Sequence, residues 1–300
     1  MDKKRRDIIR GLALMPILLA TGPLLANFKI ESSIKSRLQY SVNAYSFNAM
    51  LRSGEMTFFD MMEFAADIGL DAVDLTGYYF SSYPEIPTNS ELFLLKRKAL
   101  ELGLNISWTG IRNDFVNPDQ SSRKMDREMI RKWLTVSSSL GASIMRVFTG
   151  RHLYDGFTKD EVKDWLVEEF KTCAAYGKEN GVIIGLQNHN EFLFTSTEII
   201  EILERVDSEW FGLILDIGSL QAENPYNEIE KLAPYANYWF IKEHIAPNGL
   251  KTPVDMKKVA TILRNQEYQG YISFESLSDD DPKKIISTML NSFRKEYEKH

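Results

Sequence analysis

The chain has 300 residues, of which 44% are hydrophobic, enough apolar material for one large core or two small ones. Its formal net charge of −6 argues against a protein that binds the phosphate backbone of nucleic acids, because such proteins carry a basic face. The sequence contains one cysteine, Cys173, which excludes an internal disulfide. An acidic enzyme and a ligand-binding domain remain as the open classes.

Residues 1–30 resemble an export signal of the Sec or twin-arginine type. Basic residues that include Arg5 and Arg6 precede the apolar run GLALMPILLATGPLLA, which two prolines interrupt. A basic start followed by a short apolar run is typical of a secretion signal and makes a poor membrane span. We therefore expect an exported, periplasmic protein with no stable membrane span after processing. An uncleaved N-terminal anchor is the alternative.

Eight strand-like segments alternate with helical segments after about residue 37. The segments are 38–47, 70–79, 104–111, 142–150, 182–190, 211–219, 236–245 and 270–277. Gly69, Gly103, Gly141 and Gly181 each stand between a predicted helix and the next strand, where a left-handed residue ends a helix. This order and length predict a parallel eight-stranded (β/α)8 TIM barrel over residues 38–298. A doubly wound open sheet is the alternative, but the first strand ends in NAYSFNAM and lacks a glycine-rich phosphate loop.

Polar side chains gather at the predicted carboxyl ends of the strands, where a barrel of this kind builds its active site. Strand alternation places every second residue toward the barrel axis. The inward set is Asn43, Tyr45, Asp74, Thr76, Arg146, Gln187, His189, Asp216, Lys242, His244, Ser273 and Glu275. Each of these has an ordinary structural interpretation on its own, such as a turn cap or an ion pair. Burying so many ionisable groups together is costly unless they pair or bind a ligand, so the set as a whole predicts a functional site.

Four motifs in order, LQNHN, LDIGS, WFIKE and GYISFES, resemble the xylose isomerase-like TIM barrels, a family of sugar phosphate isomerases and epimerases. The resemblance covers most of residues 38–297. It implies a divalent metal held by Glu, Asp, His and Glu at the ends of strands five to eight. The matching positions here are Gln187, Asp216, Phe240 and Glu275. Gln187 offers only a neutral carbonyl oxygen and cannot act as a general base, and Phe240 offers no ligand atom.

Metal binding remains an expectation in a changed form. His189, Asp216 and Glu275 make a mixed nitrogen and oxygen set for one divalent metal, Mn, Zn, Co or Mg. We expect no organic cofactor. In the alternative, Lys242 or Arg146 polarises the substrate carbonyl without a metal.

The resemblance implies a sugar isomerase or epimerase that transfers a proton next to a carbonyl. Glu275 is the expected general base, and Lys242 and His189 are the other expected catalytic residues. The expected substrate-binding residues are Asn43, Tyr45, Asp74, Tyr78, Trp108, Arg146, Gln187 and Asn188. Tyr45, Tyr78 and Trp108 would offer apolar faces to a sugar ring.

Two further functions stay open. One is an exported carbon–oxygen lyase that acts on 3-keto-glycosides by β-elimination. The other is a catalytically inactive carbohydrate-binding barrel, which the Gln187 and Phe240 substitutions favour. In each case the expected partner is a small carbohydrate and not a nucleic acid, and the family resemblance also implies a homo-oligomer.

Overall fold

The computed structural model describes residues 38–189 and 191–299, and the predicted export signal lies outside these residues. Eight parallel strands close into a barrel in the order β1-β2-β3-β4-β5-β6-β7-β10, and β10 pairs with β1. The barrel strands are β1 Leu38–Val42, β2 Ala72–Thr76, β3 Asn105–Gly110, β4 Ile144–Val147, β5 Ile183–Gln187, β6 Phe211–Asp216, β7 Ala236–Lys242 and β10 Gly270–Glu275. The predicted (β/α)8 barrel is confirmed.

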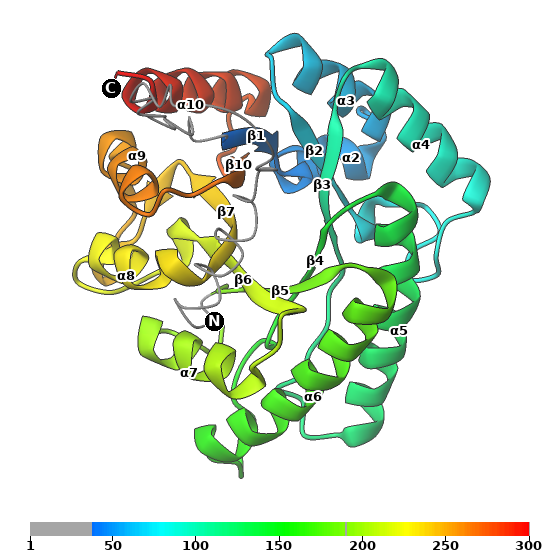
Figure 1. Ribbon diagram of the computed structural model, residues 1–300, viewed down its shortest axis with the longest axis vertical. Helices are drawn as coiled ribbons and strands as arrows, with labels where there is room; N and C mark the ends of the chain where they lie inside the picture. The colour runs from blue at the N-terminus through cyan, green and yellow to red at the C-terminus, as the bar shows by residue number, and fades with distance from the viewer. Residues whose placement is uncertain (1–37, 190, 300) are drawn as a thin grey trace, which may run out of the picture. The chain divides into compact units, whose positions relative to one another are not determined.

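The α-helices lie outside the strands and surround them (Figure 1). They are α2 Asn48–Ser53, α3 Phe58–Asp67, α4 Asn89–Glu101, α5 Gln120–Leu140, α6 Lys159–Asn180, α7 Ser196–Val206, α8 Pro225–Leu232, α9 Met256–Asn265 and α10 Pro282–Tyr297. Short 3-10 helices are η1 Ala44–Phe47, η2 Gly77–Tyr79, η3 Ile217–Ser219, η4 Ala233–Tyr235 and η5 Pro247–Gly249. In the described part of the chain, no helix combines the length and apolarity that a membrane crossing requires.

Local sequence signals fix where several helices begin and end. Helix α6 begins with a capping box in which Thr158 and Glu161 satisfy each other's backbone amides, and Thr195 and Glu198 do the same for α7. Helix α6 ends at Asn180 and is capped by Gly181, whose φ of 68° belongs to the left-handed region that glycine adopts without strain. These signals set the length of each connection and therefore the place where the next strand starts.

A second, smaller apolar cluster fills the inside of the barrel. Its buried members are Trp108, Ile144, Ile214, Tyr238 and Phe240. Ile144, Ile214 and Phe240 each precede an inward polar residue by two positions on the same strand, so the cluster lies one layer toward the amino ends of the strands. This layer forms an apolar floor beneath the polar residues at the carboxyl ends.

Candidate active site

Three buried charged residues meet at the carboxyl ends of β6, β7 and β10. The Lys242 Nζ lies 2.6 Å from the Glu275 Oε2 and 3.3 Å from the Asp216 Oδ2. Lys242 and Glu275 are paired in the β7–β10 register, which places both side chains at the same height in the barrel. The ammonium therefore lies between two carboxylates that come from different strands, and the predicted convergence of these three residues is confirmed.

The Asp216 carboxylate is held by a dense set of hydrogen bonds. Gln187 donates its side-chain Nε2 to the Asp216 Oδ2 over 2.8 Å, and the Ser219 Oγ donates to the same oxygen over 3.0 Å. The Gly218 amide donates to the Asp216 Oδ1 over 3.0 Å. Asn188 fixes the backbone, because it donates to the Asp216 carbonyl and accepts from the Asp216 amide. Gln187 and Asn188, which the sequence predicted to bind substrate, thus hold Asp216 next to Lys242.

Glu275 has a different environment, with fewer partners. Its Oε2 accepts hydrogen bonds from Lys242 and, over 2.9 Å, from the Asn43 Nδ2. Burial raises the pKa of Glu275, and the Lys242 ammonium opposes this shift without cancelling it. Burial alone would lower the pKa of Lys242, but the carboxylates of Asp216 and Glu275 outweigh it and raise that pKa above its usual value. Lys242 is therefore a charged ammonium at neutral pH. The Glu275 carboxylate is more basic than that of an ordinary glutamate.

Asp74 lies beneath the site and has no exposed surface. Its Oδ2 accepts from the Ala44 amide over 2.8 Å, and its Oδ1 accepts from the Thr76 hydroxyl over 2.7 Å. Burial raises the pKa of Asp74 to about 8. The sequence predicted direct substrate binding by Asp74, but in the structure it fixes the turn after β1 that carries Asn43 and Tyr45.

Arg146 projects from β4 into a cage of aromatic rings. The centroids of the Tyr78, Trp108 and Phe148 rings lie 5.7, 5.2 and 4.2 Å from its guanidinium carbon. A Cβ at Gly110 would lie 3.0 Å from the Arg146 Nε, so any larger residue at this position would crowd the Arg146 side chain. The sequence missed Phe148, which lies just beyond the end of β4.

Trp108 differs from its predicted role. We expected it to offer an open face to a sugar, but it is fully buried in the apolar floor. Its ring packs against Phe240 and beneath Arg146. Tyr45 and Tyr78 are partly exposed, as a stacking surface requires.

His189 lies at the rim of the site, beside Phe148. Its side chain is 43% exposed, its Nδ1 lies 3.2 Å from the Glu191 Oε1, and its ring packs edge-on against Phe148 at 4.9 Å. Strand β5 ends at Gln187, so the alternation that would have turned His189 inward stops two residues before it. Among the described residues, His189 forms no hydrogen bond or ion pair with Asp216 or Glu275.

The residues present do not fit the metal centre that the resemblance implies. Among residues 38–189 and 191–299, no group of three or more His, Cys, Asp and Glu side chains is arranged to hold a metal ion. Lys242 brings its own positive charge between the two carboxylates, and the Gln187 amide donates to Asp216. Phe240 lies in the apolar floor, so Lys242, two residues further along β7, is the strand-seven residue at the site.

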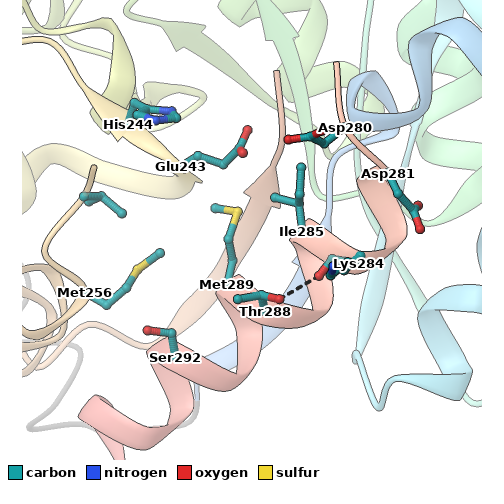
Figure 2. Close-up of a pocket in the computed structure, with 11 residues that line it drawn as sticks. Glu243, His244, Met256, Asp280, Asp281, Lys284, Ile285, Thr288, Met289 and Ser292 are labelled. Carbon is teal, nitrogen blue, oxygen red and sulfur yellow. Dashed lines mark hydrogen bonds between the residues drawn. The ribbon is translucent and has the colours of Figure 1, made fainter. Parts of the chain in front are cut away.

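A separate pocket lies outside the barrel, between the end of β7 and helix α10. It has a volume of about 590 Å³, and Figure 2 shows Glu243 and His244 among its lining residues together with Lys284 and Met289 of α10. Glu243 points away from Lys242 and accepts from the Ser276 hydroxyl over 2.8 Å. His244 begins the short strand β8 (His244–Ile245), which pairs with β9 (Thr252–Pro253). The strand alternation beyond Lys242 therefore fails for His244 as well.

Solved structures of sugar epimerases have the same fold. A D-psicose 3-epimerase from Clostridium cellulolyticum H10 matches with a TM-score of 0.72 and 15% identity over 86% of this chain and 99% of that chain. A 3-keto-D-glucoside 4-epimerase from E. coli matches with a TM-score of 0.70 and 12% identity over 86% and 100%. A probable 3-DHS dehydratase from Bacillus anthracis matches with a TM-score of 0.66 and 18% identity over 84% and 97%. At these identities the likeness shows the fold.

A search of curated protein sequences found no match. The family model described as xylose isomerase-like TIM barrel matches residues 62–296, which is most of the sequence. This match agrees with the motifs at the ends of strands five to eight and with the closed barrel. The chain belongs to the xylose isomerase-like TIM barrel family.

Proposed function

We propose that this protein is a sugar isomerase or epimerase that moves a proton next to the carbonyl of a keto-sugar. The observation that carries the proposal is the Lys242 ammonium between the buried carboxylates of Asp216 and Glu275. A basic carboxylate next to a fixed cation is the pair of groups that enolisation needs.

Glu275 acts as the base. Its carboxylate accepts the proton from the carbon beside the carbonyl, and the electron pair of that C–H bond forms the double bond of an enediolate. The former carbonyl oxygen then carries the negative charge, which Lys242 stabilises through a charged hydrogen bond. Return of the proton from Glu275 to the neighbouring carbon, with transfer of that carbon's hydroxyl proton to the enediolate oxygen, gives an isomer. An epimer forms when a proton donor on the opposite face protonates the original carbon. Asp216 holds Lys242 in place throughout.

The names of two structural neighbours support the class of reaction. The D-psicose 3-epimerase and the 3-keto-D-glucoside 4-epimerase are both named as sugar epimerases. These names do not identify the substrate of this chain. The 1–30 segment adds a proposal about place: an exported, periplasmic enzyme would meet free sugars and glycosides more often than sugar phosphates.

Solvent deuterium incorporation tests the proposal. The purified protein is incubated in D2O with D-fructose, D-tagatose and D-fructuronate, and proton NMR follows loss of the signal at the carbon next to the carbonyl. Wild-type protein should exchange that proton for at least one substrate. Glu275→Gln should slow the exchange by about 100-fold or more, the usual effect of removing a general base.

Glu243→Gln is the matched control, because Glu243 is the neighbouring carboxylate that points out of the barrel. Its exchange rate should equal that of wild type. A 3-keto-glycoside is added in parallel, and release of the aglycone would replace the isomerase proposal with the β-elimination lyase. Sugar binding without exchange would indicate an inactive binding barrel.

A further inference from the structure

Arg146 is a buried cation that the described residues leave without an ion pair. It is 5% exposed, and no carboxylate among the described residues forms an ion pair with it. Its Nη1 donates to the Gln187 Oε1 over 3.5 Å and its Nη2 to the Ile111 carbonyl over 3.4 Å, both at the long limit for a hydrogen bond. Its Nε is buried and has no hydrogen-bond partner within the described part of the chain.

Arg123 shows how this chain buries an arginine that serves only the fold. It is also 5% exposed, but its Nε donates to the Glu169 Oε1 over 2.9 Å and its Nη1 to the Asn117 carbonyl over 2.7 Å. Buried charges normally have such partners, because an unpaired buried charge is expensive. Arg146 lacks such partners, and we attribute this difference to a bound anion that is absent from the protein alone.

The surroundings of Arg146 limit what that partner is. Tyr78, Trp108 and Phe148 each place a ring within 6 Å of the guanidinium carbon, which favours the cation but supplies no anion. The two carboxylates at the mouth are already bonded to Lys242. The Gln187 side chain accepts from Arg146 and donates to Asp216, which places the guanidinium next to the carboxylates that bind Lys242. A planar guanidinium suits a planar carboxylate, to which it can donate two parallel hydrogen bonds.

We propose that the substrate is an acidic sugar, a keto-uronate or keto-aldonate, whose carboxylate binds Arg146 while its carbonyl lies against Lys242. This inference rests on the proposed function, because it assigns the second end of the same substrate. Lys242 and Glu275 perform the chemistry, and Arg146 selects the acid and fixes its orientation.

The test compares D-fructuronate with D-fructose, which differ only in a carboxylate in place of a hydroxymethyl group. D-fructose 6-phosphate is the third probe and distinguishes a carboxylate from a phosphate. Deuterium exchange should be at least 10-fold more efficient, as kcat/KM, with D-fructuronate than with either of the others. Arg146→Gln should remove about 100-fold from kcat/KM for D-fructuronate, mainly through KM, and so abolish the preference for D-fructuronate over D-fructose. Arg146→Lys keeps the positive charge but cannot donate two parallel hydrogen bonds to a carboxylate, so it should recover part of the loss.

Arg131→Gln is the control, because Arg131 also stacks on a tyrosine ring, that of Tyr176, but on the outer helices. It should leave all rates unchanged. Equal exchange of acidic and neutral ketoses, or a preference for the phosphate, would overturn the acidic-sugar inference and leave the isomerase proposal standing.

If wild-type protein exchanges no substrate, calorimetry separates the two ideas. Binding of D-fructuronate that Arg146→Gln abolishes and Arg146→Lys partly restores would support the anion subsite while the isomerase proposal falls. No binding of D-fructuronate, or binding that ignores Arg146, would overturn the subsite. Circular dichroism of each variant confirms that a loss of binding is not a loss of fold.

Discussion

Lys242→Met should destabilise the fold strongly at neutral pH. Lys242 bonds the Glu275 carboxylate at 2.6 Å and the Asp216 carboxylate at 3.3 Å, and all three side chains are buried. Removal of one partner from a buried ion pair costs about 3–5 kcal/mol, because it leaves buried charge uncompensated. Here two carboxylates lose their cation, so we expect the upper half of that range at pH 7. Urea unfolding followed by circular dichroism measures the free energy of unfolding.

The pH dependence of this loss has a definite sign. Lys242 lowers the pKa of Glu275, so its removal raises that pKa further above the value in the unfolded chain. A carboxyl group with a raised folded-state pKa is most favourable when protonated, so the variant is least destabilised at acid pH. The deficit relative to wild type should therefore grow between about pH 4 and pH 8. Lys98→Met is the control: Lys98 bonds Glu63 at 2.6 Å with both side chains partly exposed, and its loss should cost about 1 kcal/mol or less. Equal losses for the two variants, or a deficit that ignores pH, would refute the reasoning.

Two more predictions follow from the buried carboxyl groups. Burial raises the pKa of Asp74 to about 8. Ionisation of this group should therefore lower the free energy of unfolding of the wild type by about 1.4 kcal/mol per pH unit, from the pKa of Asp74 in the unfolded chain up to pH 8. Asp74→Asn should remove this dependence, and urea unfolding that gives the same pH dependence for wild type and variant would contradict it. The double substitution Gln187→Glu and Lys242→His creates a Glu, Asp, His and Glu set, so calorimetry should show Mn²⁺ binding at the site in this variant only; equal binding by wild type would show that Lys242 does not block a metal.

The sequence predicted the barrel because each signal is local. Capping residues, helix-ending glycines and the alternation of apolar segments are all readable without knowledge of the partner strands, and they place each strand end within a few residues. Asp216, Lys242 and Glu275 are the last residues of their strands, so strand alternation correctly turned them toward the axis.

Strand alternation gave wrong predictions for residues beyond the end of a strand. It also could not give the position of a side chain along the barrel axis. His189 and His244 lie beyond the ends of β5 and β7, where alternation no longer holds. Trp108 and Phe240 do point inward, but alternation cannot say in which layer an inward side chain lies, and both belong to the apolar floor. The pairing of Lys242 with both carboxylates depends on strand register, which the sequence does not state.

The central claim is that Lys242 supplies the positive charge of the reaction. Deuterium exchange by wild type and Lys242→Met, each with EDTA and then with added Mn²⁺, tests it most directly. We predict that EDTA leaves wild-type exchange unchanged and that Lys242→Met is inactive with or without Mn²⁺. Wild-type exchange that stops in EDTA and returns with Mn²⁺, or an active Lys242→Met, would contradict it.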